Sequence, residues 1–176
     1  MQEVLQVVRR TALYFRPQIM TKMCHEGWAS YWHERLFMRD QRIKTHETDY
    51  ARVDSGVTLD PRVGINVYGV GKHLYEFLED MATKGKLSPS YQLLKGIDPR
   101  KRYDEQRGEA FGKHVLFEAR TYLNDSLLVN FLSDEDFQDF VDRYQLWVVG
   151  ARPSRTQWGV ADLYIKKLLT RNFEAI

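Results

Sequence analysis

The residues with the most varied chemistry lie in one short segment, from Met23 to Arg35, which contains one cysteine, two histidines and two glutamates. A zinc protease box needs two histidines four residues apart with a glutamate between them, so that both imidazoles reach one metal ion. Here His25 and His33 are eight apart. On a helix this spacing separates them by about 80° around the axis and about 12 Å along it. One metal ion therefore cannot bind both histidines unless the helix breaks at Gly27.

A second set of polar residues shares one face of the same predicted helix. Glu26, Ser30 and His33 follow one another at spacings of four and three residues, which return to nearly the same face. In one interpretation, the carboxylate and the imidazole are core polar groups that a neighbouring helix satisfies, because burying an unpaired carboxylate is costly. In the other, they belong to a metal or acid–base site that is completed elsewhere. Spacing alone leaves both interpretations open.

The segment Gly64–Gly71 is the predicted partner of this face. Asn66 offers an amide, Tyr68 offers a phenol, and the glycines permit another backbone to approach closely. We expect Glu26 and His33 to point into one polar pocket near Asn66 and Tyr68. In the metal interpretation, Glu26 and His33 are catalytic residues and ligands of a divalent transition metal, and an open site needs at least one more ligand.

Three further features are weaker candidates for a functional site. Cys24 lies beside His25, which could activate a thiolate, but a free cysteine in an apolar helix is more often a core residue. The basic cluster between Lys95 and Arg107 is interrupted by acidic residues and is typical of a solvated loop. Gly64–Gly71 lacks the Lys-Ser/Thr ending and the preceding strand of a phosphate-binding loop.

The elements that must position these residues are mostly helices. Apolar residues at three- and four-residue spacing predict one helix that breaks or kinks at Pro17, and a second from Gln18 to about Arg39. The second is apolar over most of its circumference, which is typical of a helix at the centre of a domain. We therefore expect Trp28 and Trp32 to be largely buried. Asn66 and the run that starts at Ser133 are predicted N-terminal caps of later helices.

The pattern changes near the C-terminal end. Residues 144–150 form a β-rich run, residues 151–155 a turn, and residues 156–163 a partner strand, with a final helix after them. A single hairpin is marginal alone and must pack against helices. The predicted fold class is mainly α (α+β): a helical domain over residues 1–142 around a buried central helix, with a small β-hairpin plus a helix over residues 143–176.

Composition limits the classes of function. The 26 basic and 24 acidic residues nearly cancel, so charge gives no indication of a nucleic-acid-binding protein. The single cysteine excludes an internal disulfide and is typical of a reducing compartment. No apolar run approaches the roughly 20 residues that cross a bilayer, and the N-terminus lacks the order of a secretory signal. We expect a cytoplasmic protein without a membrane span.

Three segments resemble the stage V sporulation protein R (SpoVR) family. Residues 14–33 are similar to the family's run of Tyr-Phe-x-Pro-Gln, Thr-Lys, Asn-Glu-Gly-Trp-Ala and Trp-His. Residues 64–71 are similar to its Asn-Pro-Tyr-x-Leu-Gly stretch, and residues 117–132 to its later helix pair. All three occur in the family's order. Two positions depart from the pattern: His25 stands where Asn is usual, which favours Glu26 and His33 as candidates, and Val67 replaces a Pro.

The resemblance implies a function as well as a fold. Family members are much longer, so residues 1–176 correspond to one SpoVR-like domain that is a fragment or a shortened member. The resemblance implies a cytoplasmic protein of unknown biochemical activity that is implicated in sporulation (spore cortex formation) or stationary-phase physiology, and that acts with protein partners in an assembly. The alternative is one part of a metal-dependent, hydrolase-like enzyme, in which upstream histidines complete a site at Glu26 and His33. The oligomeric state stays open.

Overall fold

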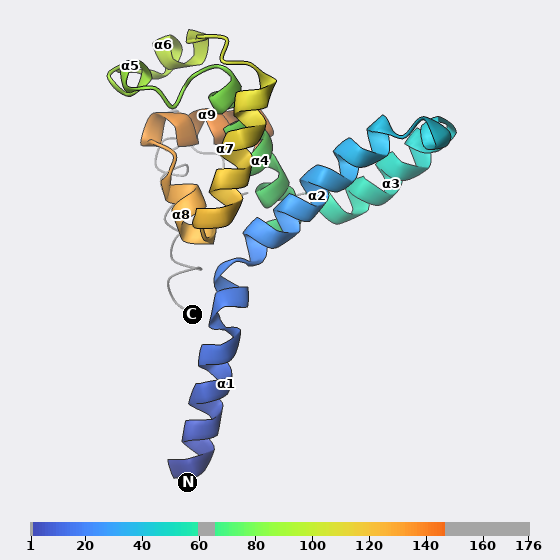
Figure 1. Cartoon of the computed structure of the whole chain (residues 1–176), viewed down its shortest axis with the longest axis vertical. Coiled ribbons are helices and arrows are strands. Elements are labelled where there is room, and N and C mark those ends of the chain that lie inside the picture. The colour runs from blue at the N-terminus through green and yellow to red at the C-terminus, as the bar shows by residue number, and fades with distance from the viewer. Residues whose placement is uncertain (1, 60–65, 147–176) are drawn as a thin grey trace, which may run out of the picture.

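A computed structural model of the chain describes residues 2–59 and 66–146, and every element among these residues is helical. The elements are α1 (Gln2–Met20), α2 (Lys22–Arg39), the 3-10 helix η1 (Gln41–His46), α3 (Glu47–Thr58), α4 (Val67–Thr83), α5 (Pro89–Gln92), α6 (Ile97–Arg102), α7 (Glu109–Tyr122), α8 (Asp125–Asn130) and α9 (Asp134–Tyr144). In Figure 1, α1 projects away from the other helices and α2 lies alongside α3. Of the remaining helices, α7 and α9 pack against α4, while η1 joins α2 to α3 at the end away from the core.

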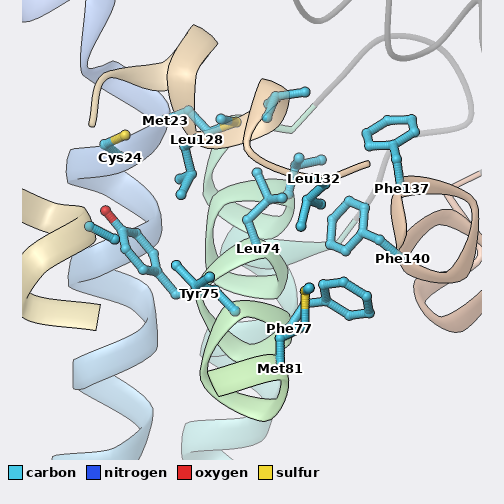
Figure 2. Close-up of a cluster of buried hydrophobic side chains, with 14 of the residues drawn as sticks. Met23, Cys24, Leu74, Tyr75, Phe77, Met81, Leu128, Leu132, Phe137 and Phe140 are labelled. Carbon is cyan, nitrogen blue, oxygen red and sulfur yellow. The ribbon is translucent and has the colours of Figure 1, made fainter. Parts of the chain in front are cut away.

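The helix at the centre of the core is α4. It contains 11 buried residues, more than any other described helix, and its apolar side chains point in several directions. Figure 2 shows Tyr75 beside α2, where Met23 and Cys24 lie, while Phe77 points toward Phe140 of α9. Full burial of such side chains stabilises a fold by roughly 1.5–3 kcal/mol each. The packing of α4 therefore supplies much of the stability of the described domain.

The prediction that the Gln18–Arg39 helix is the buried centre is wrong. The buried residues of α2 lie between Met23 and Tyr31, whereas Leu36 and Met38 are 61% and 48% exposed. Beyond Trp32, the apolar side chains of α2 no longer face the core, and this part of the helix lies alongside α3 (Figure 1). Trp28 and Trp32 pack against the edge of the core and are only partly buried. An all-round apolar pattern did not distinguish a central helix from one that leaves the core halfway along.

The first helix also differs from its prediction. Instead of breaking at Pro17, α1 continues to Met20, and the chain turns at Thr21, whose hydroxyl donates to the Pro17 carbonyl at 2.8 Å. A proline removes one backbone donor from a helix interior, and here the helix ends within a turn of it. No described residue of α1 is buried. Among the described helices, α1 therefore contacts its neighbour α2 at its C-terminal end.

The predicted β-hairpin is wrong where the structure describes it. Tyr144, the expected first strand residue, is the last residue of α9, and Gln145 ends this helix in a left-handed conformation at φ 54° and ψ 39°. Phe137, Phe140, Val141 and Tyr144 recur at helical spacing, which continues the helix past the start of the β-rich run. The rest of the predicted hairpin and the final helix lie outside the described residues. The described fold is all-α, with no strand in residues 2–59 and 66–146.

Two predicted helix starts are confirmed. The Asn66 side chain accepts a hydrogen bond from the Tyr68 backbone N–H at 3.0 Å and caps α4. The Ser133 hydroxyl accepts from the Asp136 N–H at 3.2 Å and caps α9. Both bonds satisfy backbone donors that the first turn of a helix leaves unpaired.

A pair of glycines allows α2 and α4 to cross in close contact. Residues that are 44 positions apart face each other, so that Gly27 meets Gly71 and the ring of Tyr31 lies 6.2 Å from that of Tyr75. This constant offset means that the two helices run in the same direction. A Cβ added to Gly27 would lie 2.3 Å from the carbonyl carbon of Gly71. The expectation that another backbone packs closely on the Gly69–Gly71 segment is therefore confirmed at Gly71.

Candidate functional site

The three segments that resemble the SpoVR family meet at the first turn of α2. The backbone N–H groups of Met23 and Cys24 donate to the two carboxylate oxygens of Asp125, at 2.9 and 2.7 Å. Asp125 is fully buried in the first turn of α8. Gly71, from the second segment, packs on the same turn, because an added Cβ would lie 2.5 Å from the Met23 carbonyl oxygen. Here the residues of the resemblance form a packed junction.

The structure brings two of the four predicted site residues together. The Glu26 carboxylate is half-buried and lies beside the Tyr68 hydroxyl, and this neighbour raises the pKa of that phenol. Glu26 comes from α2 and Tyr68 from the second position of α4. This contact lies at the outer edge of the α2–α4 pair, one turn of α2 away from the capped first turn.

The other two predicted site residues have different neighbours. His33 is exposed, and its ring centroid lies 5.3 Å from that of Tyr50 on α3. The Asn66 amide donates to the carbonyls of Val57 and Leu59 at 2.7 and 3.0 Å, which joins the end of α3 to the start of α4. Within residues 2–59 and 66–146, no hydrogen bond or ion pair joins His33 to Glu26. Those residues also contain no group of three or more His, Cys, Asp or Glu that could hold a metal ion.

A buried ion-pair cluster was missed by the sequence analysis. The Lys72 ammonium, on an 8% exposed side chain of α4, lies 3.1 Å from the Glu34 carboxylate and 2.9 Å from that of Asp54. Tyr50 donates to the other Asp54 oxygen at 3.2 Å. The only sequence signal was a lysine inside the apolar stretch of α4. Its partners belong to α2 and α3, which spacing within one helix does not reveal.

Neither of the nucleophilic groups in this region is activated. Burial disfavours the charged form of Lys72, but the two carboxylates outweigh it, so the pKa of this ammonium lies above its usual value. Burial, together with the nearby Asp125 carboxylate, raises the pKa of the Cys24 thiol. A charged ammonium and an un-ionised thiol are poor nucleophiles. These contacts fit stabilisation of the α2–α3–α4 packing better than covalent chemistry.

The burial of His73 makes the stability of the chain depend on pH. Its ring stacks on Tyr144 at 4.2 Å, and its Nδ1 atom is buried without a hydrogen-bond partner among the described residues. Burial, with a smaller effect of the Lys72 ammonium, lowers the pKa of His73 from 6.5 to about 4, against an opposing effect of Asp54. Between these values the unfolded chain binds more protons than the native chain. The contribution of His73 to stability is therefore fully present above the pKa of the unfolded chain, 6.5, and is lost as the pH falls from there toward about 4.

We expect His73→Phe, which keeps the ring stack, to flatten this dependence. The measurement is the free energy of urea unfolding from roughly pH 7 down to pH 5, above the range in which carboxylates dominate. The wild-type protein should lose stability across this range and the variant should lose less. Equal slopes for the two proteins would contradict the account of His73.

The described part of the chain is thus an all-helical domain. Its parallel helices α2 and α4 cross at Gly27 and Gly71, and the Asp125 carboxylate caps α2. A family model described as "SpoVR like protein" matches residues 1–167. The chain therefore belongs to the SpoVR-like family, as the three segments predicted.

The chain is also similar to "Uncharacterized protein YcgB" of Escherichia coli (strain K12), with 22% identity over 148 residues. This match covers 78% of the chain and 27% of the relative, so the chain spans about a quarter of that relative's length. No solved structure matches the chain. Among the described residues, no helix is both long enough and apolar enough to span a membrane.

Proposed function

We propose that this chain acts in the cytoplasm as the docking part of a SpoVR-type assembly that serves sporulation or stationary-phase physiology. The observation that carries the proposal is the exposure of α1. This helix has 19 residues, and none of them is buried. Its large apolar side chains are between 37% and 72% exposed: Val4, Leu5, Val7, Val8, Leu13, Tyr14, Phe15 and Ile19. Exposed apolar side chains gathered on one helix are typical of an interaction site.

The chemistry of α1 indicates what kind of surface it binds. One face carries an apolar series at alternating three- and four-residue spacing: Leu5, Val8, Ala12, Phe15 and Ile19. This is the pattern by which an amphipathic helix enters an apolar groove. The flanks carry Arg9, Arg10 and Arg16, against one acidic residue, Glu3. The partner is therefore a protein with an apolar groove that is bordered by carboxylates, because opposite charges favour this docking orientation.

The test introduces Val8→Glu together with Phe15→Glu into the gene in its host. Both side chains are exposed, so the melting temperature of the purified chain should not change, whereas two charges on the docking face should abolish the contact. We expect loss of stationary-phase survival, or of spore yield in a sporulating host, to the level of a deletion strain. The tagged variant should also elute at a smaller size than the wild-type complex.

The matched control is Gln2→Glu together with Gln6→Glu, which adds the same charge to the polar face of the same helix. This control should retain both the complex and the phenotype. A deletion strain without a defect in either condition would reject the cellular role. A docking-face variant that still forms the complex would reject the role of α1.

The metal-dependent enzyme remains the competing hypothesis, with Glu26 and His33 as ligands. The Glu26–Tyr68 contact supports this hypothesis, because it places a carboxylate and a phenol side by side at the edge of α2. A metal site there would need a further ligand from outside the described residues. Metal analysis of the purified full-length protein distinguishes the two hypotheses. A stoichiometric transition metal that is lost on Glu26→Ala would favour the enzyme.

A further inference from the structure

A polar groove lies on the side of the α2–α4 pair that faces α7 and α9. It encloses about 500 Å³ and is lined by three arginines and four carboxylate residues, together with Thr83 and Tyr144. Binding sites for small ligands typically enclose roughly 300–1,000 Å³. The groove is therefore large enough for a ligand the size of a short peptide.

Two of the arginines are held in fixed positions by carboxylates of α4. Arg35 donates to Glu79 at 2.5 Å and lies over the Tyr31 ring, with its Cζ atom 4.2 Å from the centroid. Arg143 donates to Asp80 at 2.8 Å. The Arg35–Glu79 pair has no net charge, whereas Asp80 is shared between Arg143 and Lys84 and does not balance both cations. Each guanidinium keeps further N–H donors, since arginine has five. These pairs line the groove with bound guanidinium groups.

Two charged side chains of the groove, one basic and one acidic, belong to neither of these pairs and come from different helices. Arg39 of α2 forms no ion pair with any described residue. Glu76 of α4 likewise forms none within the described ranges, and the Tyr144 hydroxyl lies close to its carboxyl group. Burial raises the pKa of Glu76, and the nearby Lys72 and Arg35 cations only partly offset this effect. The fourth carboxylate, Glu109, lies 3.6 Å from Lys113 of its own helix.

We propose that this groove binds a zwitterionic ligand of the amino-acid or short-peptide class, with its ammonium at Glu76 and its carboxylate at Arg39. A ligand of one sign would satisfy only one of the two groups and would repel the other. A zwitterion supplies a counter-charge to both, and charge-assisted hydrogen bonds are the stronger ones. Arg35 and Arg143 would add donors to the ligand's carbonyl groups. This site is independent of the docking role of α1.

The experiment is isothermal titration of the full chain with L-alanine, dialanine and trialanine, which present the same two charges at increasing separation. We expect one member of the series to bind, and Arg39→Gln and Glu76→Gln each to weaken it by about tenfold or more, the loss of one charge-assisted hydrogen bond. Arg39 is exposed, so Arg39→Gln should leave folding intact. Arg52→Gln, an exposed arginine on α3, is the control and should bind as the wild type does.

Blocked peptides test the assignment of the two charges. The N-acetyl form of the tightest peptide lacks the ammonium, and its C-terminal amide lacks the carboxylate. Both should bind at least about tenfold more weakly to the wild-type chain. The proposal is overturned if no peptide binds at millimolar concentration, if Arg39→Gln binds as tightly as the wild type, or if either blocked peptide retains full affinity.

Discussion

Replacement of Gly27 by alanine should destabilise the chain by about 3 kcal/mol, because the added methyl group has no free space. The new Cβ would lie 2.3 Å from the Gly71 carbonyl carbon and 2.5 Å from the Gly71 Cα. Both are backbone atoms of a helix, so no side chain can rotate away. The helices must separate, which disturbs the packing of Tyr31 against Tyr75 and of Met23 against the core. The higher helix propensity of alanine offsets only about 1 kcal/mol of this loss of stability.

The matched control is Gly56→Ala, in the last turn of α3. A Cβ at Gly56 would meet nothing within 4 Å, so this substitution gains helix propensity without a clash. It should stabilise the chain by about 0.5–1 kcal/mol. Urea unfolding, followed by circular dichroism, gives both free energies. A Gly27→Ala variant as stable as Gly56→Ala would show that the two helices do not cross at the glycines.

The features that could be predicted from the sequence are those that depend on residues close together in the chain. Asn66 and Ser133 cap the helices that they precede, because a cap bonds to a backbone N–H only two or three residues ahead. The glycine-rich start of α4 indicated a close backbone neighbour, although only the fold identifies it as Gly27. Tyr144 shows the limit of local reasoning, since a β-rich run and a helical apolar face overlap at that residue.

The candidate site was less predictable because its partners come from separate helices. Glu26 and His33 share a face of α2, yet Glu26 lies beside Tyr68 of α4 and His33 packs on Tyr50 of α3. Lys72 was overlooked because its two carboxylates belong to α2 and α3. The spacing of residues within one helix determines which share a face, but not which element covers that face.

Replacement of Asp125 by asparagine should cost about 2–3 kcal/mol of stability, because its carboxylate is the N-terminal cap of a helix 101 positions away. Thr21, which precedes α2, makes no side-chain cap bond. An asparagine would keep one acceptor for Met23 or Cys24, but its NH₂ group would face the other backbone donor. The buried negative charge at the positive end of the α2 dipole would also be lost.

The control for this substitution is Asp98→Asn, at an exposed position of α6, which should leave the free energy of unfolding within about 0.5 kcal/mol. Cys24 supplies a local measurement, because it is the single cysteine of the chain and only 1% exposed. Loss of the cap should let the first turn of α2 open, so that a thiol reagent labels Cys24 of Asp125→Asn faster than that of the wild type in the absence of urea. Global unfolding alone would accelerate labelling only in proportion to the measured loss of stability, whereas fraying of this turn adds to it. Equal labelling rates with equal stabilities would show that Asp125 does not hold α2 in place.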